Sequence, residues 1–293
     1  MPNRIYVFIL IEYIIALLSE CFTLSIFGAL LFATIRSKSA RYSTSMQIYA
    51  IVQTALSISV ILYFVYLTTV WQSTEADAYF IYFTGSVQTT LFIMSSLSVC
   101  ILGIDRCLAV KIPTRSFNTS CFWGYIVVNI VFLAVNLVER LFPAYPATPI
   151  THCQYFGCLL SDYQNTIYYI LRACGSLINF VVGTVLAVFL KRVTITNRNM
   201  VKSSKMVIAT CFITVTFDLL PHILSVIAYQ IFNFNLASYI GPYSTVIGAI
   251  ENGICAFFYR TTFKCCNKTV DSSTSNLPNV HNTPNINNET TVR

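Results

Sequence analysis

Seven long apolar stretches alternate with shorter polar segments along this chain of 293 residues. An α-helix needs about 20 mostly apolar residues to cross the hydrocarbon core of a bilayer, and each stretch is long enough. We therefore expect an all-α membrane protein, a seven-transmembrane helix bundle. The approximate bounds of the expected helices are Ile5–Ile35, Met46–Trp71, Tyr79–Ile104, Cys121–Phe142, Thr166–Leu190, Met206–Phe232 and Tyr239–Tyr259.

Lysine and arginine are distributed unevenly among the segments that connect these stretches. The first, third and fifth connections and the C-terminal segment carry nearly all of them, and the second, fourth and sixth carry none. Basic residues beside a membrane-spanning helix favour the cytoplasmic side. The distribution predicts an N-terminus outside and a C-terminus in the cytoplasm, in a multi-pass protein of the plasma membrane. Arg4 is the one exception.

The composition agrees with a membrane environment. Charged residues make up 10% of the chain, whereas a soluble domain has about 25%. The formal net charge of +7 is divided among segments that border apolar stretches, so it indicates membrane lipids and not nucleic acid as a partner. The first apolar stretch is too long for a cleavable signal peptide, and we expect none.

The third expected helix ends in Asp105-Arg106-Cys107, followed by apolar residues and Pro113. This ending resembles the acid–arginine motif of G-protein-coupled receptors. The resemblance implies that Asp105 holds Arg106 in the inactive state and that Arg106 contacts a heterotrimeric G protein on activation. The alternative is an ordinary interfacial ion pair that ends a helix, with Arg106 reaching the lipid headgroups.

Within this superfamily the chain looks most like the nematode serpentine chemoreceptors, with a very short N-terminus, short loops and divergent motifs. That likeness implies a chemosensory receptor for an external ligand, either a small molecule or a peptide. Two departures are clear: Gln53 stands in a region where many receptors have a sodium-binding aspartate, and the seventh helix lacks the N-P-x-x-Y motif.

A few ionisable residues fall inside the expected spans. Such residues are costly in hydrocarbon, so we expect them to point into the bundle as a polar network or a ligand pocket. The set consists of Glu20, Arg172, Asp218, His222 and Glu251. For Arg172 we consider an anionic ligand, or a pair with Asp162 or Glu139. Glu20 is a candidate partner of Glu251.

Asp218 and His222 are four residues apart and share one helix face, and Pro221 lies between them. A proline inside a helix removes a backbone hydrogen bond, so we expect a bend there. The run around Pro221 is similar to the proline-hinged sixth helix of the receptor family, which implies a hinge for activation. A static kink that packs well is the alternative.

Two pairs among the eleven cysteines stand apart from the apolar spans. Cys153 and Cys158 lie in an expected extracellular loop, where a local disulfide can form, with free thiols as the alternative. Cys265 and Cys266 follow the last span, on an expected short juxtamembrane helix, and are candidates for palmitoylation or are unmodified thiols. We expect residues 1–266 to form the transmembrane domain and residues 267–293 a disordered cytoplasmic tail.

Several other functions lack the residues that they need. The chain has no nucleotide-binding phosphate loop, no H-E-x-x-H motif and no C-x-x-C pair, and its three histidines are scattered. We therefore expect no catalysis, no metal and no cofactor. The alternative class is an ion-coupled transporter or a ligand-gated channel that uses Glu20, Asp218 and Glu251. Transporters commonly show internal repeats, and none is evident here.

Overall fold

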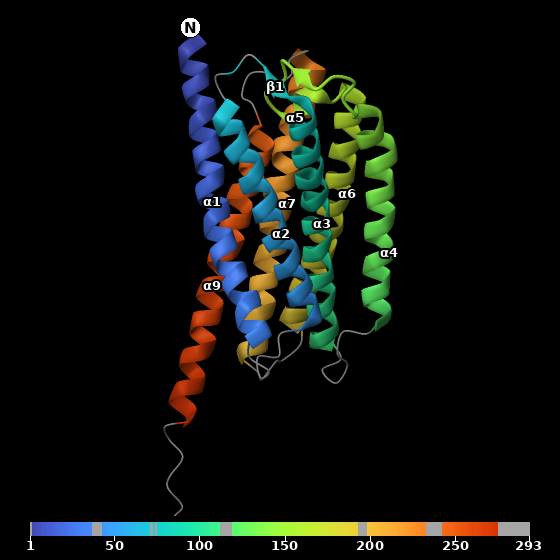
Figure 1. The fold of residues 1–293 in the computed structure, drawn as a ribbon. Helices are drawn as coiled ribbons and strands as arrows, with labels where there is room; N and C mark the ends of the chain where they lie inside the picture. The colour runs from blue at the N-terminus through green and yellow to red at the C-terminus, as the bar shows by residue number, and fades with distance from the viewer. Residues whose placement is uncertain are drawn as a thin grey trace, which may run out of the picture.

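The computed structural model describes residues 2–36, 43–70, 73, 75–111, 119–192, 198–232 and 242–274, which form a bundle of long helices (Figure 1). The long helices are α1 (Pro2–Arg36), α2 (Thr44–Val70), α3 (Ala78–Lys111), α4 (Thr119–Val135), α6 (Asp162–Arg192), α7 (Arg198–Phe232) and α9 (Tyr243–Thr274). The short elements are strand β1 (Ala76–Asp77), π-helix η1 (Asn136–Leu141), 3-10 helix η2 (Phe142–Ala144), strand β2 (Ile150–Thr151) and helix α5 (Phe156–Leu159).

Six helical segments within the described residues are long and apolar enough to cross a membrane. They lie in α1, α2, α3, α4 with its η1 and η2 extension, α6 and α7. The chain therefore has the helices of an all-α, multi-pass membrane protein. Helix α9 contains most of the seventh expected span, Tyr239–Tyr259. It is less apolar than the other long helices, since it contains Glu251, Arg260 and Lys264. A seventh membrane crossing stays a prediction.

The surface of the bundle is apolar, which matches a lipid environment. Large hydrophobic side chains are exposed along much of α4, among them Val127, Ile130 and Val131, and on α6 at Leu177 and Val181. In water an apolar surface of this extent would favour aggregation or binding to a partner. In a bilayer this apolar surface contacts lipid tails, so burial of apolar side chains contributes little to helix association. Close packing and polar contacts between the helices hold the bundle together instead.

Helix α3 lies at the centre of the bundle and α4 at its edge (Figure 1). Helix α3 packs against α2, α4, α5, α6 and α7, and it is the most buried of the six apolar helices, whereas α4 is the least buried. Helix α9 packs between α1 and α7 and closes the other side. At the end of α3, Asp105 is buried and Arg106 is half-buried.

The two ends of the bundle differ. At one end, which we call the hairpin end, β1 pairs with β2 in an antiparallel ladder with Ala76 opposite Thr151. At the opposite end, which we call the basic end, three helices finish with a basic residue in the last turn: Arg36 in α1, Lys111 in α3 and Arg192 in α6. Cations at helix C-termini also interact favourably with the helix dipole.

Helix α9 runs without interruption from Tyr243 to Thr274, eight residues past the expected end of the transmembrane domain at Cys266. The rest of the expected tail lies outside the described residues. Near the basic end, α9 is held by an aromatic cluster. The rings of Phe27 on α1, Tyr49 on α2 and Tyr259 on α9 lie with centroids 5.3–5.5 Å apart, and all three side chains are fully buried. Aromatic contacts of this kind favour close packing of three helices.

Candidate functional site

Arg172 on α6 forms a buried ion pair with Asp218 on α7. The Arg172 side chain also donates a hydrogen bond of 2.9 Å to the Tyr168 hydroxyl, and its guanidinium lies 4.8 Å from the centroid of the Phe92 ring. Both charged residues are almost inaccessible, Arg172 at 4% and Asp218 at 2%. A single charge at the centre of a membrane helix costs about 2.5–3.5 kcal/mol on insertion scales, so mutual neutralisation stabilises the bundle.

This pair differs from the partners that we predicted for Arg172. Glu139 is exposed on η1, the Asp162 side chain lies outside the described set, and the carboxylate that pairs with Arg172 among the described side chains is that of Asp218. Both partners were among the expected intramembrane residues, but their pairing depends on how far α6 and α7 are shifted along each other. That shift is set by tertiary packing and has no signal in the sequence.

His222 lies one turn from Asp218, nearer the hairpin end, and is buried against two tyrosines. Its ring centroid is 4.7 Å from that of Tyr169 and 5.8 Å from that of Tyr168. Pro221 lies between Asp218 and His222 inside α7, which continues on both sides of it from Arg198 to Phe232. The structure thus places Asp218 and His222 one turn apart on α7 and adds Arg172, for which we predicted other partners, to the same group. A hinge motion at Pro221 stays a prediction.

Glu20 on α1 is fully buried and connects three helices. One carboxylate oxygen accepts a hydrogen bond of 2.7 Å from Ser57 on α2, and the other accepts one of 2.8 Å from Asn252 on α9. Glu251, the residue before Asn252, interacts electrostatically with both Glu20 and Arg172. Helix α9 therefore joins the Glu20 group to the Arg172–Asp218 pair, and Asn252 is a direct partner of Glu20 that the sequence did not indicate.

Asp105 and Arg106 form a second ion pair at the basic end, with 3.5 Å between the Asp105 carboxylate and the Arg106 guanidinium. Both are held by residues at the start of α2. Ser45 donates a hydrogen bond of 2.7 Å to Asp105, and Arg106 donates one of 2.9 Å to Ser43. The Ser43 carbonyl also accepts the first backbone hydrogen bonds of α2. The pair therefore links the ends of two helices as well as closing α3.

Arg140 on η1 is a buried cation that our sequence analysis missed. It is 1% exposed and is the largest of the fully buried side chains. Its Nη1 atom donates to the Thr89 hydroxyl at 3.0 Å and to the Asn136 amide oxygen at 3.3 Å, and its guanidinium lies 4.3 Å from the Tyr168 ring centroid. The available signal was a lone arginine inside the fourth expected span, Cys121–Phe142.

The π-helical turn explains why Arg140 points inward. Asn136 and Arg140, four residues apart, are both buried, and the three residues between them are exposed. Residues four apart on a helical turn share a face. Single π-helical turns inside α-helices are rare and frequently occur at functional sites. The turn therefore aims a cation from a peripheral helix at the interior of the bundle.

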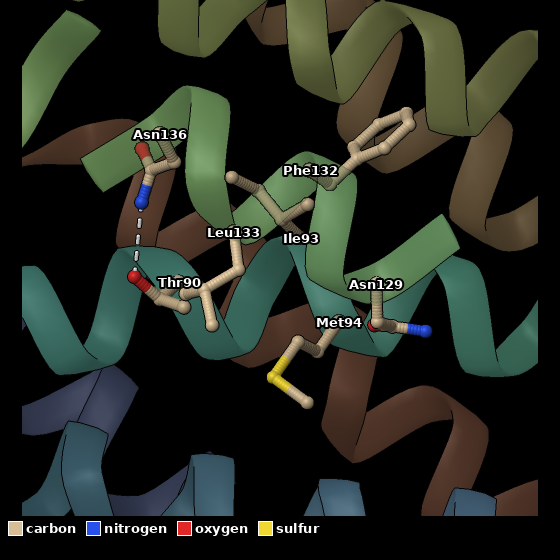
Figure 2. Close-up of a pocket in the computed structure, with 7 residues that line it drawn as sticks. All are labelled: Thr90, Ile93, Met94, Asn129, Phe132, Leu133 and Asn136. Atoms are coloured by element: carbon tan, nitrogen blue, oxygen red, sulfur yellow. Dashed lines mark hydrogen bonds between the residues drawn. The ribbon is translucent and has the colours of Figure 1, made fainter. Parts of the chain in front are cut away.

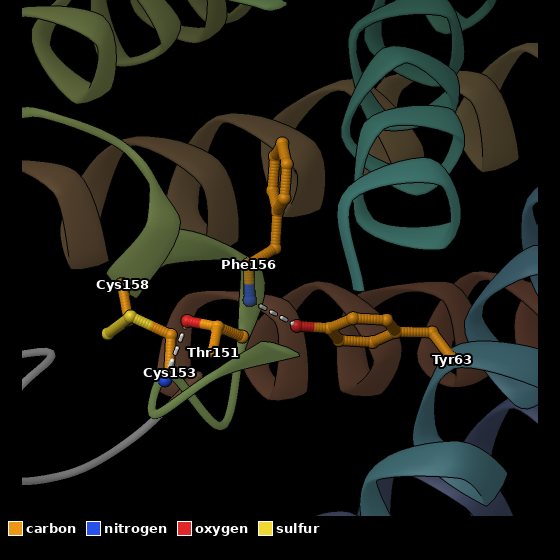
Figure 3. The surroundings of a disulfide bond; sticks show 5 residues. All are labelled: Tyr63, Thr151, Cys153, Phe156 and Cys158. Carbon is orange, nitrogen blue, oxygen red and sulfur yellow. Dashed lines mark hydrogen bonds between the residues drawn. A yellow bond between two sulfur atoms is a disulfide. The ribbon is translucent and has the colours of Figure 1, made fainter. Parts of the chain in front are cut away.

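A disulfide closes a loop at the hairpin end (Figure 3). Cys153 is bonded to Cys158, and the backbone N–H of Phe156, inside the loop, donates a hydrogen bond of 2.8 Å to the Tyr63 hydroxyl. The Phe156 ring is buried against Gly85 of α3, where any side chain would collide with it, and its centroid lies 5.2 Å from the Arg140 guanidinium. The loop therefore places an aromatic ring directly beside the buried cation.

A shallow crevice lies between α3 and the α4–η1 segment (Figure 2). Its lining is largely apolar, with Asn136 and Thr90 joined at one side by a hydrogen bond of 3.0 Å. The lining residues are Thr90, Ile93, Met94, Asn129, Phe132, Leu133 and Asn136. Because the Asn136 oxygen accepts from Arg140, one amide side chain connects the crevice to the buried guanidinium.

Two further expectations concern metals and lipidation. Among the described residues, no group of three or more His, Cys, Asp or Glu side chains could hold a metal ion. Cys265 and Cys266 lie on the last part of α9, where the side chains are outside the described set. A scan against known protein families gives no match to this chain, and a search of curated proteins gives none either. A functional assignment therefore depends on the fold and the buried polar groups.

Proposed function

We propose that this protein is a G-protein-coupled receptor of the plasma membrane, with chemosensory recognition of an external small molecule or peptide. In this proposal the chain crosses the membrane seven times, the hairpin end faces outward, and the basic end faces the cytoplasm. The observation that carries the proposal is the Asp105–Arg106 pair, which ends the most buried helix at the basic end and is held by the start of α2.

Activation requires two states of the bundle whose populations a ligand shifts. The contacts of Arg106 with Asp105 and Ser43 support an inactive state in which these two residues hold Arg106 at the end of α3. In the active state, release of these contacts frees the guanidinium for the G-protein α-subunit. In this proposal the Arg172–Asp218 pair and Pro221 couple ligand binding to G-protein binding. They lie on α6 and α7, which run between the hairpin end and the basic end.

The test is guanine-nucleotide exchange on purified heterotrimeric G proteins, measured with membranes that contain the receptor and no added ligand. We expect Asp105→Asn to raise basal exchange, because it weakens the hold on Arg106. We expect Arg106→Ala to reduce exchange to the level of receptor-free membranes. Arg36→Ala, which changes an exposed arginine at the same end, is the matched control and should keep exchange unchanged.

The proposal fails if no G protein in the panel responds to the wild type or to Asp105→Asn. It also fails if the proposed orientation is wrong. An epitope placed after Arg293 should be inaccessible to antibodies on intact cells and accessible after permeabilisation, because positively charged segments favour the cytoplasmic side. Labelling of that epitope on intact cells would contradict the proposed coupling, since the basic end would then lie outside.

A further inference from the structure

Arg140 is a buried cation that takes part in neither of the two ion pairs found among the described residues. Among the described residues, its Nη1 atom donates hydrogen bonds to two neutral oxygens, those of Thr89 and Asn136. Within the described part of the chain its Nε atom has no hydrogen-bond partner. A guanidinium has five N–H donors and binds a carboxylate through two parallel hydrogen bonds, so this side chain has unused capacity for an anion.

Two aromatic rings lie over the Arg140 guanidinium but do not neutralise its charge. The Tyr168 ring lies 4.3 Å and the Phe156 ring 5.2 Å from the guanidinium carbon. Such contacts stabilise a cation through the ring faces and leave the N–H groups in the guanidinium plane free to bind an acceptor. The Asn136 amide oxygen, 3.3 Å from Nη1, occupies a position that a carboxylate oxygen would take.

Tyr168 connects this cation to the interior pair. Its ring faces Arg140, and its hydroxyl accepts the hydrogen bond from Arg172. An anion at Arg140 would therefore act on a residue that also contacts the Arg172–Asp218 pair between α6 and α7. The arrangement offers a direct physical link between ligand binding and the helices that the proposed activation moves.

The crevice between α3 and the α4–η1 segment indicates what kind of molecule could carry such an anion. It opens on the outer surface of the bundle, since Leu133 is well exposed, and most of its lining is apolar. Its polar side is formed by Asn136 and Thr90 (Figure 2), and the Asn136 amide oxygen accepts a hydrogen bond from Arg140. An apolar chain in the crevice would thus end at Asn136, one hydrogen bond away from the guanidinium.

From these contacts we infer that Arg140 binds the anionic group of an amphiphile, a carboxylate or phosphate on an apolar body, in the position that the Asn136 amide oxygen now takes, and that the apolar body lies along the outer surface of the bundle at the shallow crevice between α3 and α4. Calling this molecule the activating ligand rests on the proposed receptor function, whereas the binding itself does not. The same chemistry is present in a soluble carboxylate such as octanoate and in an anionic phospholipid, and the experiment separates these two sources.

The test measures thermal stability of the purified full-length protein in nanodiscs of phosphatidylcholine. Octanoate at about 10 mM, a concentration suited to a fragment-sized ligand, should stabilise the wild type, and the neutral octanamide should not. Arg140→Gln removes the charge but keeps hydrogen-bonding groups, and we expect it to weaken octanoate binding about 30-fold or more. Arg140→Lys should retain part of the affinity, and Arg36→Gln, the exposed control, should retain all of it.

Two further arms define the source and the position of the ligand. Nanodiscs that contain phosphatidylglycerol should stabilise the wild type over Arg140→Gln if the lipid is the natural occupant, and octanoate should then add little. Leu133→Trp fills the crevice at an exposed position, so it should weaken octanoate more than acetate. Equal effects on both acids would overturn the assignment of the crevice.

Equal stabilisation of the wild type and Arg140→Gln by octanoate would overturn the inference, as would no stabilisation by either octanoate or phosphatidylglycerol. If Arg140→Gln does not fold, Arg140→Lys replaces it: octanoate should stabilise Arg140→Lys less than the wild type, and equal stabilisation of the two would overturn the inference. Failure of the receptor proposal looks different. In that case octanoate or phosphatidylglycerol binds in an Arg140-dependent manner but never changes nucleotide exchange on any G protein.

Discussion

The two arginines that are buried in the described part of the chain, Arg172 and Arg140, are balanced in different ways. Arg172 pairs with a carboxylate on the neighbouring helix, whereas Arg140 contacts two neutral oxygens and two aromatic rings. Both are at most 4% exposed, so burial does not distinguish them. The difference teaches that the partner of a buried charge, and not its burial, indicates its role. Arg172, which has a carboxylate partner, holds two helices together, and Arg140, for which the described residues supply no carboxylate, is the arginine that we propose binds a ligand.

The largest expected effect comes from removing the partner of Arg172. Asp218→Ala leaves an uncompensated buried guanidinium, and we expect a loss of about 3–5 kcal/mol of stability, since breaking a buried pair costs that much. Thermal unfolding in detergent micelles measures it. The double change Arg172→Met with Asp218→Leu should recover most of the loss. A small effect of Asp218→Ala alone would remove the contrast between the two arginines.

A smaller loss is expected where α9 joins the polar interior. Glu20→Ala leaves Ser57 and Asn252 without their shared acceptor, and we expect a cost of about 1–2 kcal/mol for the two lost hydrogen bonds, judging from values inside membranes. The same unfolding assay checks it, with Glu20→Gln as the control that keeps one acceptor oxygen. Identical stability of Glu20→Ala and the wild type would mean that this group contributes no net stability.

A substitution that places a carboxylate beside Arg140 would give this arginine an ion pair like that of Arg172. Thr89→Asp places an acid at the position that already accepts from Nη1, and we expect stability to rise by about 1 kcal/mol, in the range of a hydrogen bond to a charged group. The same change should abolish stabilisation by octanoate, because the introduced carboxylate occupies the guanidinium. Thr89→Asn is the uncharged control and should leave octanoate binding in place.

The smallest expected effect is that of removing the Arg140 charge. Arg140→Gln eliminates a cation with no described carboxylate partner, so we expect the free energy of unfolding to change by less than about 1 kcal/mol, because no charge is left unpaired. Arg172→Gln, which does leave Asp218 unpaired, is the comparison within the same assay. A loss for Arg140→Gln as large as that for Arg172→Gln would show that Arg140 is a structural residue.

Much of the fold was predictable because membrane helices have a strong sequence signal. The expected span Met46–Trp71 corresponds to α2 from Thr44 to Val70, and Met206–Phe232 ends at the same residue as α7. Hydrocarbon tolerates no unsatisfied backbone groups, so a long apolar stretch is nearly obliged to be helical. The π-helical turn at Asn136–Leu141 was not predictable in this way, because its signal is local packing and not composition.

The site was predictable only as a set of residues. The need to keep charges out of hydrocarbon indicated that Glu20, Arg172, Asp218 and Glu251 point inward, and all four are buried. The sequence did not indicate which of them meet, and Asp218 was not among the partners that we predicted for Arg172. Arg140 was missed because a cation close to the end of a span is usually expected to reach the headgroups, whereas the π-helical turn directs it inward.

By itself, the sequence determined that the chain folds into long apolar helices with their basic residues concentrated at one end, because solubility in lipid and charge depend on residue type alone. Only the tertiary structure decided that Arg172 meets Asp218, that Asn252 meets Glu20 and that Arg140 points at Tyr168. Those contacts depend on the rotation and relative shift of each helix. Both are set by packing among all the helices together, so no single segment of the sequence contains them.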